Sequence, residues 1–212
     1  MTGRFVTIEG GEGGGKSTFI LGLGLALSQK GIQFQATREP GGTPGAEEIR
    51  SLLLKGSVKR WDRMSETLLL FAARRDLIVN FIRPALKQGQ WVLCDRFVDS
   101  TIAYQGGGGG LDVGFIKNLY DVISEGLKPD LTFLLDIDPA LGLARATHRL
   151  ATTQNEEGRF EQMPLSFHQK IRQSFLDMAH ENPDRYCLID ATLPPQDILQ
   201  LAMEHLEKKG WL

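Results

Sequence analysis

The chain has 212 residues, of which 42% are hydrophobic, and its 24 basic and 26 acidic side chains give a net charge of −2. This length and composition allow one α/β domain with a full hydrophobic core, whereas two separate domains would each be small. The balanced charge excludes a general basic field for nucleic acid, so clusters of arginine are expected to serve small anions. No basic leader with an apolar run opens the chain, and no apolar run approaches the roughly 20 residues of a membrane span. We therefore expect a soluble, cytoplasmic protein without nucleic-acid or membrane partners.

The two cysteines, Cys94 and Cys187, lie inside apolar runs that resemble strands. A buried free thiol behaves as a small hydrophobic group. A disulfide is the alternative, but secretory features are absent. We predict two free thiols.

Short β-branched or apolar runs alternate with longer stretches of helical spacing. The predicted strands cover residues 4–8, 32–37, 91–95, 131–135 and 186–189. The predicted helices cover residues 18–29, 46–54, 66–87, 113–124, 139–149, 165–180 and 195–209. Pro84 should kink the third helix. This alternation predicts an α/β fold with a five-stranded parallel sheet flanked by helices, in which ligands bind beyond the carboxyl ends of the strands.

The first predicted strand is followed by Gly-Gly-Glu-Gly-Gly-Gly-Lys-Ser, residues 10–17, and then by a helical pattern. This is a phosphate-binding P-loop, in which backbone N–H groups and the helix N-terminus face the phosphates. The residues expected to bind ATP are Gly10, Gly11, Glu12, Gly13, Gly14, Gly15, Lys16, Ser17 and Thr18. Lys16, expected to be exposed, would reach the β- and γ-phosphates, and the Ser17 hydroxyl would reach Mg²⁺. The alternative is a glycine-rich turn before an ordinary helix.

Charged residues follow the second predicted strand at Arg38 and Glu39, directly before the turn formers of residues 40–43. They lie where an open parallel sheet binds its ligands. A surface turn that caps the next helix is the alternative interpretation.

Acidic residues end the third and fourth predicted strands at Asp95 and Asp136. An acid in this position is where P-loop enzymes place the carboxylate that orders Mg²⁺ and its waters. We favour Asp95, because the neighbouring Arg96 adds a fork suited to phosphate. We expect Asp136 to cap the helix that follows it.

Residues 145–162 form a polar, weakly periodic segment that contains Arg145, Arg149 and Arg159. Such a segment between helices suits a mobile lid that closes over phosphates and supplies guanidinium groups. A solvated helix hairpin with salt-bridged arginines is the alternative.

Four motifs in order identify a family resemblance: IEGGEGGGKST at 8–18, TREPGGT at 37–43, LCDRF at 93–97 and DSTIAYQGGG at 99–108. Together they are similar to the bacterial thymidylate (dTMP) kinases over nearly the whole chain. The resemblance implies one P-loop nucleoside monophosphate kinase domain, residues 1–212, with a helical lid at approximately 145–162. It also implies transfer of the γ-phosphoryl group of ATP to dTMP with Mg²⁺, giving ADP and the dTDP used for dTTP synthesis, and a homodimer.

The resemblance further implies a set of residues that bind dTMP: Glu12, Arg38, Phe71, Arg74, Arg96, Thr101, Tyr104 and Gln105. In this set Glu12 receives the sugar 3′-hydroxyl, Arg38 and Arg96 hold the phosphate, and Tyr104 crowds the sugar 2′ position. Thr101 and Gln105 bind the thymine ring.

Phe71 offers a flat face for stacking on the base. Arg74 and Arg75 both share its helix face, and we favour Arg74 as the donor to a base carbonyl because the family usually has Ala-Ala-Arg there. Core packing is the alternative for the two aromatic residues, Phe71 and Tyr104.

The implied catalytic residues are Lys16, Arg96, Arg149 and Arg159, and the implied metal site comprises Ser17, Glu39 and Asp95. The P-loop carries an acid instead of an arginine, so the family pattern places catalytic arginines in the lid. Two features depart from that pattern. Residues 106–110 lack a basic residue, and Gly158 stands where many relatives have Asp before the lid arginine. Ala191 and Thr192 are expected to form part of the adenine pocket.

Two other functions remain open at this stage. A kinase for another nucleoside monophosphate would share the P-loop and the lid, and only the residues at the base and sugar would differ. A nucleotide switch without a phosphoryl acceptor would need only the P-loop, but the chain contains neither an Asn-Lys-x-Asp guanine element nor a Leu-Ser-Gly-Gly-Gln signature.

Overall fold

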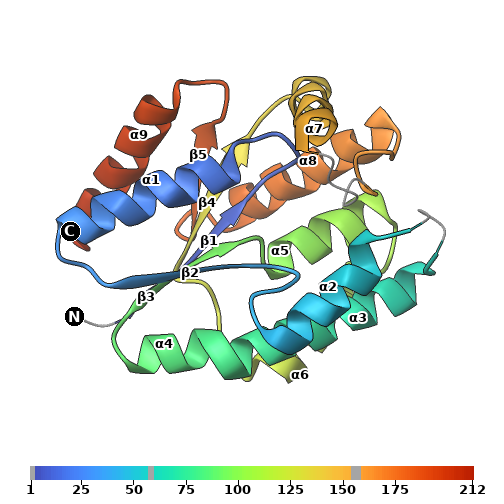
Figure 1. Cartoon of the computed structure of the whole chain (residues 1–212), viewed down its shortest axis with the longest axis horizontal. Coiled ribbons are helices and arrows are strands. Elements are labelled where there is room, and N and C mark those ends of the chain that lie inside the picture. Colours follow the sequence, from blue (N-terminus) through green and yellow to red (C-terminus); the bar gives the residue numbers. More distant parts are fainter. Residues whose placement is uncertain (1–2, 57–59, 154–158) are drawn as a thin grey trace.

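A computed structural model describes residues 3–56, 60–153 and 159–212, and shows a central sheet with helices packed on both faces (Figure 1). The strands are β1 (Phe5–Glu9), β2 (Phe34–Arg38), β3 (Trp91–Asp95), β4 (Leu131–Asp136) and β5 (Tyr186–Asp190). In the described ranges these strands form one parallel sheet with the order β2-β3-β1-β4-β5. The predicted five-stranded parallel sheet is confirmed.

The helices agree with the sequence prediction in place, though several begin earlier. The α-helices are α1 (Lys16–Gln29), α2 (Pro44–Leu54), α3 (Arg63–Leu77), α4 (Arg83–Lys87), α5 (Val98–Thr101), α6 (Val113–Ser124), α7 (Pro139–Thr153), α8 (Leu165–Glu181) and α9 (Pro195–Lys208). Two π-helical segments are η1 (Ile78–Ile82) and η2 (Ile102–Gly108). Within the described ranges, no helix combines the length and the apolar character that crossing a bilayer requires.

The third predicted helix, residues 66–87, is an unbroken succession of α3, η1 and α4. Pro84 lies in the first turn of α4, inside this continuous helical run. The wider π-helical turn of η1 directly precedes it, so the expected irregularity at Pro84 takes this form. The segment α5–η2, residues 98–108, is helical where no helix was predicted.

Two hydrophobic layers, one on each face of the sheet, hold the helices in place. Successive strand residues point to opposite faces, and accordingly Phe5 packs in one layer while Val6 packs in the other. The first layer gathers side chains of α3, η1, α6 and α8, whereas the second gathers side chains of α1 and α9. In Figure 1, α1 and α9 lie on one side of the sheet and α3, α4 and α6 lie on the other.

The strand order opens a crevice at the carboxyl end of β1. The chain leaves β1 through α1 on one face, but leaves β2 through α2 and α3 toward the other face. Helices that diverge in this way leave a gap at the switch point, where open α/β sheets bind their ligands.

The glycine run 106–110 allows η2 to pack closely on α8. A Cβ added at Gly108 would lie 2.6 Å from the Phe167 ring, and one at Gly107 would lie 2.8 Å from Ser174. Only glycine permits this approach without displacement of α8. The absence of a basic residue in the run is therefore consistent with a packing role for this segment. Cys94 and Cys187, as predicted, are both free thiols.

Candidate active site

The P-loop connects the end of β1 to the first residue of α1. A Cβ at Gly13, whose φ is 69°, would lie 2.1 Å from the carbonyl oxygen of Gly142, so the loop fits closely against α7. Lys16 folds back over the loop, where its Nζ donates to the carbonyl oxygens of Gly11 at 2.7 Å and Gly10 at 3.2 Å. We expected an exposed lysine, but its exposed fraction is only 8%. Burial and the Arg96 charge lower the pKa of Lys16 to about 8, against the opposing effect of Glu12 and Asp95.

A cleft of about 490 Å³ opens beside the P-loop at the predicted switch point. Its lining includes P-loop residues 12–18, the segment 38–40 after β2, the turn 95–97 after β3, and side chains of α3, α5 and η2. It therefore brings the predicted triphosphate site and most of the predicted acceptor residues into one continuous space. The cleft is also lined by Phe160 and Glu161 of the predicted lid segment, and by Arg50, Leu54 and Leu70, which no sequence motif indicated.

Glu12, Arg96 and Tyr104 form a compact cluster at the centre of the cleft. The Oε1 atom of Glu12 accepts hydrogen bonds from Arg96 Nη2 at 2.9 Å and from the Tyr104 hydroxyl at 2.6 Å. Burial would raise the pKa of Glu12, but Arg96, Lys16 and the Tyr104 hydrogen bond outweigh this effect and lower the pKa to about 2. Glu12 is therefore a permanent anion at neutral pH, held between two cations and a phenol.

Glu9, the last residue of β1, supports the turn that carries Arg96. Arg96 has a left-handed φ of 67°, which is strained for a residue with a side chain. Both carboxylate oxygens of Glu9 accept hydrogen bonds across this turn, from Phe97 N at 2.7 Å and from the Ser100 hydroxyl at 2.6 Å. Burial and the nearby Asp99 raise the pKa of Glu9 to about 8. The sequence analysis missed Glu9, because only the pairing of β1 with β3 places it beneath this turn.

Arg74 and Glu39 form a buried ion pair in the cleft wall. Arg74 Nε donates to both carboxylate oxygens of Glu39 at 2.9 and 3.1 Å, and Nη2 donates to one of them at 2.7 Å. Nη2 also donates to the Thr101 hydroxyl at 2.9 Å, whereas the buried Nη1 has no hydrogen-bond partner among the described residues. Arg74 thus keeps one guanidinium donor, Nη1, that is not paired with another described residue. Glu39 was expected to hold a metal, but here both of its oxygens are bonded to Arg74.

Phe71 does not line the cleft, contrary to the predicted stacking role. Its side chain is 3% exposed and lies in the core, where the Arg74 guanidinium covers its ring with the carbon at 4.8 Å from the centroid. Leu70, which precedes Arg74 by four residues, lines the cleft instead. The spacing i, i+4 places Leu70 and Arg74 on one helix face, so the apolar cleft residue of α3 is one position earlier than predicted.

Ser17 and Asp95 meet at the phosphate end of the cleft. The Ser17 hydroxyl donates to Asp95 Oδ2 at 3.4 Å, and the buried Oδ1 atom has no hydrogen-bond partner in the described part of the chain. Asp136 was predicted to cap α7, but it does not. Instead, each of its carboxylate oxygens accepts a hydrogen bond from Arg172 at 2.8 Å. The cap is Asp138, which accepts from Ala140 N at 2.9 Å. Within the described residues no group of three or more His, Cys, Asp or Glu side chains forms a metal-binding cluster.

The lid arginines occupy three different environments. Arg149 lines the cleft with 56% of its side chain exposed, 3.9 Å from Glu161. Arg159 is outside the cleft lining, because its side chain is buried against Glu66 at 2.5 Å and donates to the Leu53 carbonyl oxygen at 3.0 Å. Arg145 donates to the Ala191 carbonyl oxygen at 3.1 Å, which connects the lid to the predicted adenine side. Gly158 lies outside the described residues.

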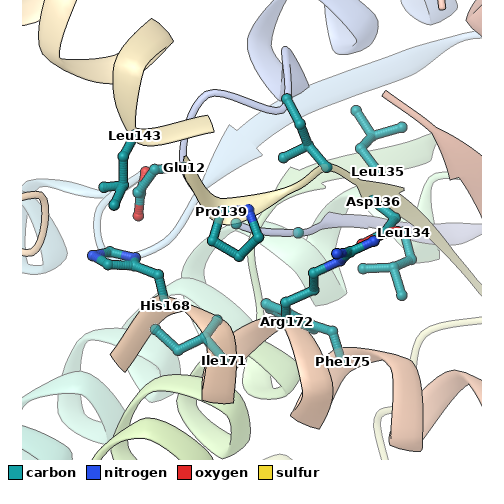
Figure 2. Close-up of a pocket in the computed structure, with 13 residues that line it drawn as sticks. Glu12, Leu134, Leu135, Asp136, Pro139, Leu143, His168, Ile171, Arg172 and Phe175 are labelled. Carbon is teal, nitrogen blue, oxygen red and sulfur yellow. Dashed lines mark hydrogen bonds and ion pairs between the residues drawn. The ribbon is translucent and has the colours of Figure 1, made fainter. Parts of the chain in front are cut away.

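A second, much smaller cavity of about 20 Å³ lies behind the P-loop, between the end of β4 and α8 (Figure 2). Gly10 and Gly11 contribute to its wall, and Glu12 and His168 border it. His168 Nε2 is 3.1 Å from the Phe160 carbonyl oxygen, and burial lowers the pKa of His168 although Glu12 opposes this effect. The cavity has space for about one water molecule. This cavity is therefore too small to hold a nucleotide.

The sheet has the strand order of an open α/β fold, and a P-loop follows its first strand. A second polar site, which includes Arg38, Arg74 and Gln105, lies in the same cleft. Together these features define this protein as a P-loop nucleoside monophosphate kinase. The sequence model of one family, thymidylate kinase, matches residues 8–202. The chain belongs to the thymidylate kinase family, and its reaction is the phosphorylation of dTMP to dTDP with ATP.

Relatives of high identity span nearly the full chain. A thymidylate kinase of Magnetococcus marinus is 50% identical over 207 residues, covering 98% of this chain and 97% of the relative. One of Afipia carboxidovorans is 46% identical, covering 98% of this chain and 90% of the relative. The crystal structure of thymidylate kinase from Ehrlichia chaffeensis has a TM-score of 0.76 at 33% identity, covering 97% of this chain and 99% of that one.

Proposed function

We propose that the large cleft holds both substrates at once, with the triphosphate of ATP on the P-loop and dTMP against α3, α5 and η2. The observation that supports this arrangement is the continuity of the cleft from Lys16 and Ser17 to Arg74 and Gln105. Phosphoryl transfer requires two polyanions to be aligned and their repulsion to be neutralised. The cleft offers cations for both tasks.

At the acceptor end, Arg38 and Arg96 bind the phosphate of dTMP. Arg38 lines the cleft with 54% of its side chain exposed, paired with Glu47 at 3.2 Å, so it can turn toward a ligand at little cost. Glu12 accepts the 3′-hydroxyl of the sugar, since it is an anion in the middle of the cleft with pKa about 2. Tyr104, oriented by its hydrogen bond to Glu12, excludes a 2′-hydroxyl.

The base lies between the remaining cleft residues of α3, α5 and η2. The free Nη1 atom of Arg74 donates to a carbonyl of thymine, Thr101 and Gln105 bind the ring edge, and Leu70 contacts its face. Leu70 replaces Phe71 in this proposal because it is the apolar residue of α3 that lines the cleft.

The residues present fit one Mg²⁺ ion at Ser17 and Asp95. An orphaned buried carboxylate oxygen beside a hydroxyl suits this cation, which binds few protein ligands and takes the rest from phosphate and water. When bound, Mg²⁺ neutralises charge on the phosphates of ATP. Glu39 is left out of the metal site, because the guanidinium of Arg74 occupies both of its oxygens.

Lys16 and Arg149 supply positive charge around the transferred phosphoryl group, together with Arg96. Lys16 reaches the phosphates by exchanging its two carbonyl contacts for stronger charge-assisted bonds. We assign the catalytic lid arginine to Arg149, because Arg159 would have to leave Glu66 to enter the cleft.

We further propose that residues 1–212 act as one cytoplasmic kinase domain that forms a homodimer. Exposed apolar side chains on three successive helical elements support a self-contact: Leu52 on α2, Leu68 on α3 and Val79 on η1 are 41–49% exposed. Light scattering of the purified protein should give twice the mass of one chain, 23.5 kDa. A monomer at micromolar concentration contradicts the dimer.

A coupled ADP assay across nucleoside monophosphates tests the function. ADP formation should depend on both dTMP and Mg²⁺. ATP turnover that is unaffected by dTMP would contradict the proposal and favour a nucleotide switch. Stronger stimulation by UMP, CMP or AMP would instead indicate a kinase for another acceptor.

A further inference from the structure

Glu66, in the first turn of α3, lies directly behind a residue of the cleft wall. Its side chain is buried and does not line the cleft, but both of its carboxylate oxygens are used. Oε1 accepts a hydrogen bond from Gln105 Nε2 at 2.8 Å, and Oε2 pairs with Arg159 Nη2 at 2.5 Å. Gln105 itself lines the cleft. Glu66 thus contacts a residue of the proposed base site from the side opposite to the ligand.

The charge of Glu66 determines which end of the Gln105 amide faces the cleft. A carboxylate paired with a guanidinium is ionised, and an ionised carboxylate only accepts hydrogen bonds. The NH₂ end of Gln105 must therefore point to Glu66. The opposite end, Oε1, accepts no hydrogen bond within the described part of the chain. The cleft is consequently offered an acceptor at Gln105 and not a donor.

This acceptor has a complementary donor close by. The buried Nη1 of Arg74 is without a partner among the described residues, and Nη2 of the same side chain bonds to Thr101, one helical turn before Gln105. A donor and an acceptor in one wall match a ring edge that has a carbonyl next to an N–H. Thymine and uracil have this edge at O4 and N3, whereas cytosine has an amino group and an unprotonated nitrogen there. Cytosine would therefore leave both the Arg74 donor and the Gln105 acceptor unpaired, which lowers the free energy gained on binding.

We propose that Glu66 is a specificity-determining positioning residue, which fixes the amide of Gln105 so that its oxygen selects pyrimidines with an N3–H. The inference rests on the proposed function, because it requires the base to lie against Gln105. It adds that the selection is enforced by a carboxylate that touches no substrate and that is held in place by its ion pair with Arg159.

Glu66→Gln tests the proposal with little change in shape. A neutral amide at position 66 can donate or accept, so Gln105 is free to reverse. We expect the ratio of kcat/KM for dTMP to kcat/KM for dCMP to fall by about tenfold, as for the loss of one oriented hydrogen bond. The KM for ATP should remain within about twofold of the parent value, because the P-loop is not involved. An unchanged dTMP-to-dCMP ratio overturns the proposal.

Two control variants distinguish an effect on the orientation of the Gln105 amide from a nonspecific disturbance of the packing around it. Arg159→Lys disturbs the same ion pair but keeps the cation, so the dTMP-to-dCMP ratio should stay near the parent value. In a Gln105→Met background, Glu66→Gln should lower the ratio no further, since the amide through which it acts is gone. A fall in Arg159→Lys equal to that in Glu66→Gln, or a further fall when Glu66→Gln is added to Gln105→Met, overturns the proposal.

A measurement on the unmodified protein covers the case in which Glu66→Gln does not fold. The monophosphate of 3-deazathymidine has the shape of dTMP but carries C–H where N3–H should meet Gln105. Its kcat/KM should be lower than that of dTMP by about tenfold or more. Equal use of the two substrates overturns the inference while leaving the kinase function intact. Absence of any dTDP formation from dTMP would instead contradict the proposed function.

Discussion

Replacing Glu39 by Gln tests whether the Arg74–Glu39 pair is a buried ion pair that holds the base site. The two side chains are 2% and 5% exposed and share three hydrogen bonds of 2.7–3.1 Å. Glu39→Gln keeps the shape but leaves the Arg74 charge uncompensated inside the protein. Removing one partner of such a pair costs about 3–5 kcal/mol. In a chain of this length each kcal/mol lowers Tm by about 2–4 °C, so Tm should fall by about 6–20 °C.

The double variant Glu39→Gln/Arg74→Met provides the matched control. It removes both charges, and apolar or neutral replacements of a buried pair are often close to neutral in stability. We expect it to recover most of the lost Tm but not the activity, because the Nη1 donor to the base is gone and the KM for dTMP stays raised. Thermal unfolding by circular dichroism gives Tm, and the coupled ADP assay gives KM. If Glu39→Gln melts within about 2 °C of the parent protein, the burial argument is wrong.

Three further predictions concern the phosphate end of the cleft. Lys16→Ala should lose most of its kcat in the coupled assay while circular dichroism shows an intact fold, because its two carbonyl contacts contribute only modestly to stability. Since the pKa of Lys16 is lowered to about 8 in the free protein, MgATP binding should be accompanied by proton uptake near about pH 8 and weaken above it, which calorimetry in buffers of different ionisation enthalpy measures. Arg149→Ala should lower kcat more than it raises the KM for dTMP in steady-state assays, because a lid cation acts mainly on the transition state.

Each of these has a result that would count against it. Full activity of Lys16→Ala would remove the P-loop assignment, and proton release or no proton change near about pH 8 would contradict the lowered pKa of Lys16. A pure rise in the KM for dTMP in Arg149→Ala would make that arginine an anchor for the bound acceptor.

Acid stability provides a fifth, independent test at Glu12. Its pKa is about 2 in the folded protein against 4.5 as its ordinary value, so the stabilisation is present above about pH 4.5 and is lost as pH falls toward about 2. Glu12→Gln should therefore flatten the decline of the free energy of unfolding in that range, measured by denaturant titration at each pH. If the free energy of unfolding declines equally steeply with falling pH in the two proteins, the lowered pKa of Glu12 is contradicted.

The sequence by itself determined the sheet, the P-loop and the position of the Asp95–Arg96 turn. These features follow from local rules: β-branched runs, helical spacing, and glycines before a helix that begins with Lys16. It also indicated Glu12, Arg74, Thr101, Tyr104 and Gln105, and all five line one cleft. Strand ends in a parallel sheet converge on one edge, so residues that follow successive strands meet there whatever the packing of the helices.

The tertiary structure alone decided which partner each charged side chain takes and which side of α3 faces the cleft. Phe71 and Leu70 are adjacent in sequence, but the docking of α3 on the sheet buries the first and exposes the second to the cleft. Glu39 pairs with Arg74 across 35 residues, and Arg159 with Glu66 across many more, so no local pattern could assign them. Helix rotation and long-range ion pairing are set by the whole core, which is why the partners of Glu39 and Arg159 could not be assigned from the sequence.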